Sequence, residues 1–419
     1  MKTLLAIAAR SAWNRRFTLA LTVFSIALST LLLLGVERIR TELRDNFSSA
    51  VSGTDLIVGA RTGSTQLLLY SVFRIGAATN NMGWKSVQDL QAHRGVAWVV
   101  PISLGDSHHG FPVLATTPEY FSRFHYGDRQ ALAMREGKPF EQLFDAVLGA
   151  DVAEQLGYRL GQKITLSHGS GELSPEHADK PFTVVGILAR TGTPVDRTVH
   201  IGLEAMQAIH LDWVAGVPVP GLKIPAEQVR KFDLSPKNVT AALVGLKSRA
   251  AVFAVQRWVA GYTEEPLMAI LPGVALDELW QVVGVGEKAL LVLSGLVGIV
   301  SLAGLVSVVL AGLNERRREL AVLRAVGAGA RHVLALLALE GALVTALGVL
   351  LGAVAAAVAL ALLGPWLQSS YGLALTVSAP TLNEWTLLGA LLAAGWLASL
   401  LPGWRAYRLS LADGLSPRI

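Results

Sequence analysis

Cysteine is absent from this chain of 419 residues. Its absence excludes a disulfide framework and any metal site built on thiolates. Charge is scarce as well, because 16% of the residues are charged and 52% are hydrophobic. A mean hydropathy of +0.47 is typical of a membrane protein that also carries a large polar portion. A polar portion of roughly 250 residues can bury enough apolar surface to fold without disulfides.

The sequence also lacks the common nucleotide-binding and catalytic motifs. Gly137-Lys138 is the only Gly-Lys pair, and it has neither the earlier glycine nor the following Ser or Thr of a phosphate-binding loop. Asp106-Ser107-His108 does not indicate a catalytic triad, because adjacent residues point apart and a triad is assembled from distant positions. We therefore expect no catalytic residue in this chain and no cofactor of its own.

Four long runs contain no charged residue, and each reaches the roughly 20 residues that an α-helix needs to cross a bilayer. They are Phe17–Val36, Ala289–Leu313, Gly341–Leu363 and Trp385–Trp404. The first run is too long for the core of a signal peptide, and Glu37-Arg38 follows it without a small-residue cleavage site. We therefore predict a retained anchor and four transmembrane helices in all.

Basic residues are concentrated in three segments, as expected of segments that stay in the cytoplasm. The amphipathic lead-in 1–16 has four basic residues and no acidic one, 314–332 has five against two, and the tail 405–419 has three against one. Residues 37–287 hold 23 basic and 26 acidic side chains, so we place them outside together with the short loop 364–384. The net charge of +5 reflects this topology and does not indicate nucleic-acid binding.

Residues 37–287 have the pattern of a mixed α/β domain between two helical stalks. Helical spacing continues through Phe47 after the first span, and 276–285 leads into the second span in the same way. Between them, short helical patterns alternate with expected strands at 55–59, 96–102, 111–116, 182–188 and 239–246. The predicted fold is membrane α-helical, with four transmembrane helices and a large mixed α/β extracytoplasmic domain.

Eight of the nine histidines lie within residues 37–287. Imidazoles without thiolates suit zinc or copper, and Asp106 stands two residues before His108. No H-x-x-x-H or H-E-x-x-H pair supplies ligands from one helix face. We interpret these histidines as scattered surface residues and predict no metal site; His108 and His109 are the candidate ligands of the metal-binding alternative.

The segment Asn314–Ala328 reads NERRRELAVLRAVGA. Its sequence pattern is more regular than we expect of a loop that only fixes topology. Its apolar residues follow helical spacing, and most of its charge lies on the other faces. The segment resembles the cytoplasmic coupling segment of the MacB/FtsX-like permeases, the membrane subunits of one class of ABC transporter. It matches that segment both in sequence and in its place between the second and third of four membrane helices.

This resemblance implies that a separate cytoplasmic ABC ATPase, which would bind ATP and Mg²⁺, holds the segment 314–332. The coupling residues that it implies are Glu315, Arg316, Arg317, Glu319, Leu320, Leu323, Arg324 and Gly327. It also implies a homodimer in the bacterial inner membrane, with residues 37–287 in the periplasm. Gly348 and Gly352 permit close helix packing, either within the chain or in that dimer.

The resemblance extends to the outer segment. Ala150–Leu166 and Phe182–Leu188 resemble pieces of the MacB-type periplasmic core domain. Residues around 104–112 and 168–225 depart from that pattern with insert-like material that carries histidines and prolines. We expect this departure to affect which substrate the protein acts on, and not the family to which it belongs.

Glu340 is the only ionisable residue between His332 and Glu384. A carboxylate within a membrane helix is costly, so it needs a partner or a function. We favour pairing with an arginine of the loop 314–332 near the cytoplasmic surface, and the alternative is a proton relay.

We therefore predict a non-catalytic permease subunit that transmits ATP-driven motion to its periplasmic domain. Membrane helices with almost no ionisable residue argue against a wide hydrophilic path through the bilayer. The expected cargo is therefore already on the outer side of the membrane, and is a lipoprotein, a peptide or a small molecule. The expected partners are the ATPase, a second copy of the chain, the lipid bilayer, and a periplasmic adaptor or lipoprotein. Two alternatives stay open: a non-transporting regulator of a cell-wall hydrolase, and a zinc-linked transporter or sensor.

Overall fold

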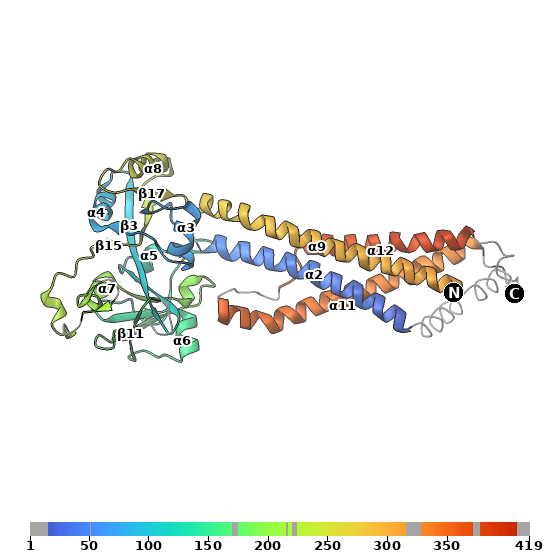
Figure 1. Cartoon of the computed structure of the whole chain (residues 1–419), viewed down its shortest axis with the longest axis horizontal. Helices are drawn as coiled ribbons and strands as arrows, with labels where there is room; N and C mark the ends of the chain where they lie inside the picture. The colour runs from blue at the N-terminus through green and yellow to red at the C-terminus, as the bar shows by residue number, and fades with distance from the viewer. Residues whose placement is uncertain are drawn as a thin grey trace. The chain divides into compact units, whose positions relative to one another are not determined.

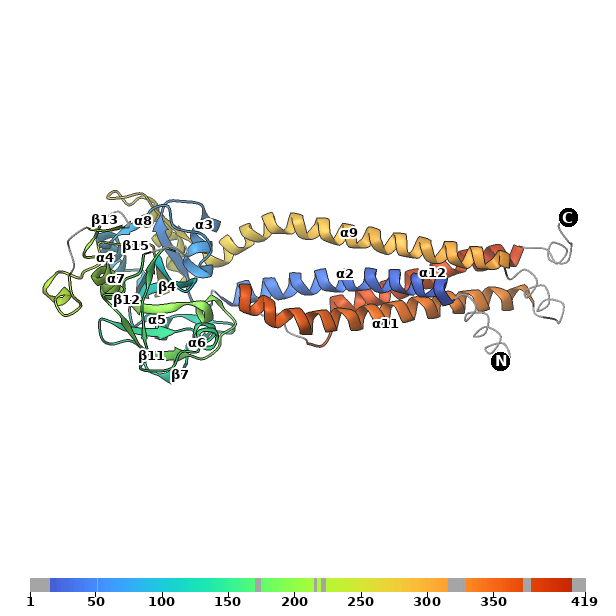
Figure 2. The same ribbon diagram turned by 60° about the horizontal axis from the view of Figure 1, so that its bottom comes forward.

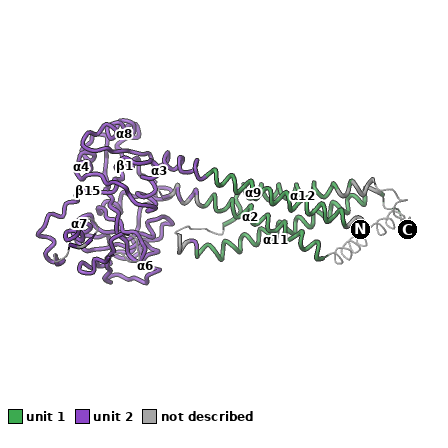
Figure 3. Tube along the Cα trace, viewed as in Figure 1, with its two compact units in different colours: residues 1–42, 284–366, 375–419 green, residues 43–283, 367–374 purple. Residues whose placement is uncertain are grey.

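The computed structural model describes residues 16–50, 52–169, 175–214, 217–219, 224–315, 327, 329–371 and 378–408. The chain divides into two compact units (Figure 3). The helical unit comprises residues 1–42, 284–366 and 375–419, and the α/β unit comprises residues 43–283 and 367–374.

Long helices build the helical unit (Figures 1 and 2). They are α2 (Arg16–Ser49), α9 (Pro272–Glu315), α11 (Ala330–Tyr371) and α12 (Leu382–Arg408). Each contains one of the predicted apolar runs, so the four predicted helices are confirmed. Within the described residues, the stretches long and apolar enough to span a membrane are Arg16–Glu42, Pro272–Ala311, Arg331–Leu367 and Leu382–Leu401.

These helices extend beyond the apolar runs. Helix α2 continues to Ser49 and α9 begins at Pro272, as the helical spacing of the predicted stalks indicates. Helix α11 continues through Pro365 to Tyr371, and α12 begins at Leu382. The loop predicted at 364–384 is therefore too long. Pro365 removes one backbone donor but does not end the helix, because the apolar residues around it continue the helical pattern.

Small residues allow α11 to pack closely on its neighbours. A Cβ atom added at Gly348 would lie 2.7 Å from Cβ of Ile26 in α2, and one at Gly352 would lie 2.5 Å from the carbonyl oxygen of Ala27. Both approaches are shorter than real Cβ contacts, so only glycine fits at these two positions. Of the two uses that the sequence left open for this pair of glycines, the structure shows packing within the chain.

The α/β unit is built on a mixed sheet with strand order β17-β1-β16-β3-β4-β12-β8-β11-β7, while β10 pairs with β3 and β9 pairs with β11. Pairs β4–β12 and β8–β11 are parallel, and the other pairs are antiparallel. The strands of this sheet are β1 (Leu56–Ala60), β3 (Val96–His108), β4 (Phe111–Thr116), β7 (Met134–Gly137), β8 (Asp145–Leu148), β9 (Lys163–Ile164), β10 (Ser167–His168), β11 (Phe182–Leu188), β12 (Val199–Gly202), β16 (Ala241–Leu246) and β17 (Leu267–Ile270).

Short strand pairs and helices complete the unit. The strand pairs are β2 (Met82–Gly83) with β15 (Asn238–Val239), β5 (His125–Tyr126) with β6 (Gln130–Ala131), and β13 (Trp213–Val214) with β14 (Val217–Pro218). The α-helices are α3 (Ser64–Leu68), α4 (Trp84–Ala92), α5 (Tyr120–Arg123), α6 (Ala150–Leu156), α7 (Leu203–Ile209) and α8 (Val252–Ala260). The short turns of helix are η1 (Leu69–Phe73), η2 (Pro194–Arg197), η3 (Val229–Lys231) and η4 (Arg249–Ala251).

Alternate residues of the central strands enter two separate cores, one on each face of the sheet. Leu56 and Val58 of β1 join the core that α4, α6, α7 and α8 cover, and Ile57 between them joins the core of α3, η1 and α5. The strands predicted at 111–116 and 182–188 are confirmed with the same bounds. Strand β3 is longer than predicted, because it pairs with β10 and the far end of β4 as well as with β16.

We predict that Gly348→Ala and Gly352→Ala each destabilise the helical unit by about 1–3 kcal/mol, the usual cost of overpacking. The added methyl group would meet Ile26 or the backbone of α2. Thermal unfolding of the full chain in detergent, followed by circular dichroism, measures the change. Gly389→Ala in α12 is the control, because a Cβ atom there meets nothing within 4 Å. Equal melting temperatures in all three variants would contradict this packing.

Candidate functional site

The structure describes the residues on both sides of the predicted coupling segment and few of those within it. Helix α9 ends at Glu315, and α11 begins at Ala330. Gly327 lies in an exposed turn with φ of +102°, a conformation that favours glycine. The other coupling residues lie outside the described residues, namely Arg316, Arg317, Glu319, Leu320, Leu323 and Arg324. The coupling role of this segment therefore stays a prediction.

Glu340 lies on α11 and is half-buried. It follows Ala330, the first residue of α11, by ten positions, close to the end of the helix nearest 314–332. Glu340 lies within the apolar stretch Arg331–Leu367, and its place relative to the membrane surface stays a prediction. Its pairing with a loop arginine stays a prediction, because those of 316–324 lie outside the described residues.

A buried charge cluster, which we did not identify from the sequence, joins α2 to the start of α12. The guanidinium of Arg38 donates from Nη1 to both carboxylate oxygens of Glu384 at 3.3 Å, and both side chains are buried. One residue earlier, Oε1 of Glu37 accepts from Nη2 of Arg40 at 2.9 Å and from Nδ2 of Asn383 at 3.3 Å. The two helices are thus joined by an ion pair at Arg38 and by a hydrogen bond at the neighbouring Glu37.

Glu384 also caps the helix that it belongs to. Its Oε2 accepts from the backbone N–H of Thr381 at 2.7 Å, and the hydroxyl of Thr381 accepts from the backbone N–H of Glu384 at 3.3 Å. This reciprocal arrangement is a capping box. The Thr-x-x-Glu spacing before the fourth apolar run was the one sequence signal of this site. Its pairing with Arg38 has no such signal, because 346 positions separate the two residues.

His108 and His109, the candidate ligands of the metal-binding alternative, do not come together with other ligands. His108 is buried, with Nδ1 2.6 Å from the carbonyl oxygen of Thr165 and Nε2 3.0 Å from the hydroxyl of Tyr158. Burial lowers the pKa of His108, so the imidazole is neutral at neutral pH. His109 is exposed in the turn between β3 and β4. Their contacts are those of structural residues.

Three other histidines do lie together. His168, His177 and His210 form, with Asp106, the one group of potential metal ligands found among the described residues. Our interpretation of scattered surface histidines is therefore wrong for these three, which lie together, and also for His108 and His200, which are buried. The physical reason is strand register: β10 pairs with β3 so that His168 stands opposite Asp106, and α7 ends where His210 reaches the same place.

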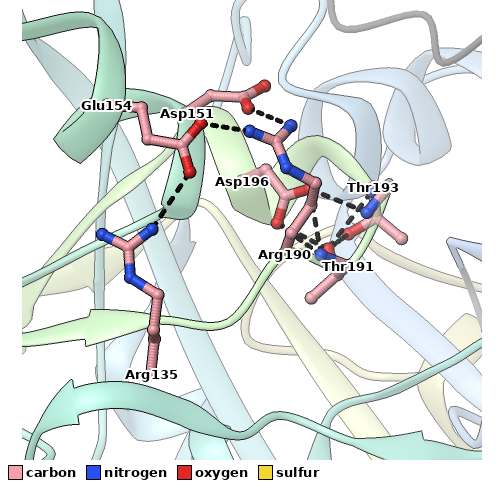
Figure 4. A network of polar contacts seen from close by, with 8 residues as sticks. Arg135, Asp151, Glu154, Arg190, Thr191, Thr193 and Asp196 are labelled. Carbon is pink, nitrogen blue, oxygen red and sulfur yellow. Dashed lines mark hydrogen bonds and ion pairs between the residues drawn. The ribbon is translucent and has the colours of Figure 1, made fainter.

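A separate network of ion pairs holds α6 on the sheet (Figure 4). Arg190, which follows β11, lies with Nη1 2.5 Å from Oδ1 of Asp151 and Nη2 2.6 Å from Oε2 of Glu154. The other oxygen of Glu154 accepts from Arg135 of β7 at 3.0 Å. Asp196 holds the adjoining turn by accepting from the backbone N–H groups of residues 191 and 192. Every carboxylate here has partners, which indicates a structural role.

We predict that Glu384→Gln destabilises the helical unit by about 3 kcal/mol, because it leaves the buried guanidinium of Arg38 without its main counter-charge. The value lies at the low end of the range for broken buried pairs, since Arg38 also lies 3.5 Å from Glu42. Thermal unfolding in detergent measures the loss, with the exposed Glu204→Gln of α7 as the control. A loss no larger than that of the control would show that the pair does not hold α12 on α2.

Two family models match this chain. The model of the MacB-like periplasmic core domain matches residues 18–261, and the model of the FtsX-like permease C-terminal region matches residues 291–411. The lipoprotein-releasing system transmembrane protein LolC of Neisseria meningitidis serogroup B is 26% identical over 239 residues, which cover 55% of this chain. The match covers 51% of LolC, so the chain spans about half the length of that relative.

Solved structures are similar over the α/β part. The periplasmic region of MacB from Actinobacillus actinomycetemcomitans is 11% identical with a TM-score of 0.34, covering 56% of this chain and 95% of that one. The extracellular domain of the transporter YknZ from Gram-positive bacteria is 12% identical with a TM-score of 0.29, covering 52% of this chain and 99% of that one. The two family models together account for both units, and the chain belongs to the MacB/FtsX-like ABC transporter permeases.

Proposed function

We propose that this chain transmits movement driven by a separate cytoplasmic ATPase to its α/β unit, and so moves cargo on the outer side of the bacterial inner membrane. The observation that carries the proposal is the continuity of two helices. Helix α2 contains the first apolar span and continues without a break to Ser49. Helix α9 begins at Pro272, directly after β17, and contains the second span.

The ends of both helices are part of a core of the α/β unit. The ring of Phe47 at the end of α2 stacks on Phe73 of η1 with a centroid distance of 4.3 Å, and it meets Trp280 of α9 at 5.7 Å. Leu276 of α9 is buried in the same core. Close-packed side chains transmit displacement with little compression. A shift of α2 or α9 along its axis would therefore displace the core residues directly.

The ATPase would act on the segment 314–332, between α9 and α11. The resemblance of Asn314–Ala328 to the family's coupling segment supports this assignment, and so does the absence of a phosphate-binding loop from the sequence. The arginine-rich composition of the segment supports a cytoplasmic position for it and for both termini. A homodimer would pack through other faces than Gly348 and Gly352, because α2 covers these two glycines within the chain.

A lipoprotein is the cargo that we favour. LolC, which the chain resembles over about half its length, is a transmembrane protein of a lipoprotein-releasing system. A lipoprotein is also already at the outer surface, so its release needs force and no hydrophilic path through the bilayer. The hydrolase-regulating alternative receives no comparable support from the relatives.

Purification of the intact protein from its native membrane tests the proposal. We expect an ABC ATPase to co-purify, and we expect the combined variant Arg316→Glu, Arg317→Glu and Glu319→Arg to lose it, because charge reversal would disrupt the contact surface. Quantitative mass spectrometry of the purified complex measures the loss.

The matched control reverses two exposed charges of the α/β unit, Arg159→Glu and Lys163→Glu, and should keep the ATPase. Absence of an ATPase from the unaltered protein, or equal loss in both variants, would reject the assignment of residues 314–332 as the coupling segment.

A further inference from the structure

The group of Asp106, His168, His177 and His210 is assembled from four separate places in the α/β unit. Asp106 lies in β3 and His168 in β10, opposite each other in the strand register. His210 follows the last residue of α7. The backbone N–H of His177 donates to the carbonyl oxygen of Leu166 at 2.8 Å, which brings its ring back to the sheet. The ligand atoms of the four side chains all lie within 4.8 Å of one another.

Two members of the group are buried without hydrogen bonds that would satisfy them. The side chains of His177 and Asp106 are both 0% exposed. Among the described residues, neither ring nitrogen of His177 has a hydrogen-bond partner, and Oδ2 of Asp106 has none either. Leaving a buried polar group unpaired costs about 1–3 kcal/mol, and more for a charged group. A purely structural histidine cluster gives no reason for these three unpaired atoms.

The distances within the group are those of ligands around one ion. Nδ1 of His168 lies 2.9 Å from Nε2 of His210 and 3.0 Å from Oδ1 of Asp106. Nε2 of His210 lies 3.5 Å from Oδ1 of Asp106, and Nε2 of His177 lies 3.9 Å from its Oδ2. Ligands about 2.0–2.1 Å from a tetrahedral zinc ion lie roughly 3.3 Å apart. The observed separations surround that value, so small shifts of side chains would close the site.

The hydrogen bonds around the group orient its nitrogens toward the shared centre. Nδ1 of His210 lies 2.8 Å from the carbonyl oxygen of Met206 and donates to it, so that in the neutral ring the lone pair is on Nε2. Neutral imidazole is the form that binds a metal ion.

Neighbouring residues neutralise the buried charge of Lys180, and Trp213 partly encloses the group. The ammonium of Lys180 is buried, and it is held by Asp212 at 2.9 Å and by Asp179 at 2.8 Å. The carboxylate of Asp106 is thus left for the histidines. The indole of Trp213 packs against His177 with a centroid distance of 4.2 Å and an angle of 45° between the rings. The side chains of His168 and His210 are 32% and 23% exposed, so an ion can enter from their side.

We propose that Asp106, His168, His177 and His210 bind one transition-metal ion, for which zinc(II) has the matching ligand chemistry. Three imidazoles and one carboxylate without thiolate suit zinc in tetrahedral coordination. Four protein ligands leave no open position, so the ion has a structural or regulatory role and no catalytic one. It ties β3, β10 and the end of α7 together. The ligands come from 104–112 and 168–225, the stretches that depart from the family pattern.

Zinc binding to the full chain in detergent tests this proposal. Protein freed of metal by a chelator is titrated with zinc(II) against a chromophoric competitor, and bound metal is counted by mass spectrometry. We expect one ion per chain, and we expect His177→Gln and Asp106→Asn each to weaken binding by at least about 100-fold. His200→Gln is the matched control, because His200 is 0% exposed in the same sheet and is not in the group. It should keep full binding.

A second measurement identifies the ligands even where a buried variant fails to fold. The chain has no cysteine, so His210→Cys introduces a single thiol at a partly exposed position. With cobalt(II) in place of zinc, the unaltered protein should show the visible absorption of a tetrahedral ion. The His210→Cys variant should add a near-ultraviolet band of thiolate-to-cobalt charge transfer, and His125→Cys should not.

Two results would overturn the proposal: no stoichiometric zinc in the unaltered protein, or equal affinity in His177→Gln and His200→Gln. Neither result bears on the ATPase contact, which involves residues 314–332. The proposed function and the metal site are therefore tested independently of each other.

Discussion

The packing of two helix ends into a core of the α/β unit is the contact on which this structure depends. Phe47 of α2 lies between Phe73 and Trp280, so the first and second membrane-spanning helices end against each other and against the sheet's helical cover. Phe47 and Trp280 are partly buried and pack against the buried residues of that core. The unit cannot shift its helix ends without repacking that core, which is the physical basis of the transmission that we propose.

The helical unit is held by two kinds of contact that suit its surroundings. Lipid offers no hydrophobic drive for helices to associate, so close approach at Gly348 and Gly352 supplies dispersion contacts instead. Beside the apolar spans, Arg38 and Glu384 add a buried ion pair between α2 and α12. Such a pair contributes little net stability but strongly disfavours other arrangements, since a shifted helix would leave a buried charge alone. The glycines allow α11 to approach α2 closely, and the ion pair favours one register of α12 on α2.

The α/β unit contains both the segments that resemble the family's periplasmic domain and the histidine group. Ala150–Leu166 contains α6 and β9, and Phe182–Leu188 is β11, all within the residues that the family model covers. The histidine group is made by residues of 104–112 and 168–225, the stretches that we expect from the sequence to depart from the family pattern, and it lies where β10 pairs with β3. A bound ion would join those added segments to the shared sheet, and would make their order depend on metal.

The sequence by itself determined the spans, the strands at 111–116 and 182–188, and the family, because hydropathy, strand periodicity and the coupling motif are local signals. It could not determine the contacts between residues far apart in the chain. His168 lies 62 positions from Asp106 and 42 from His210, so no spacing indicates that they meet, and attention fell on the adjacent His108 and His109. The register of β10 against β3 decides that meeting, and the packing of α12 on α2 decides the pairing of Arg38 with Glu384. Both depend on backbone pairing or helix packing across the fold, which only the tertiary structure fixes.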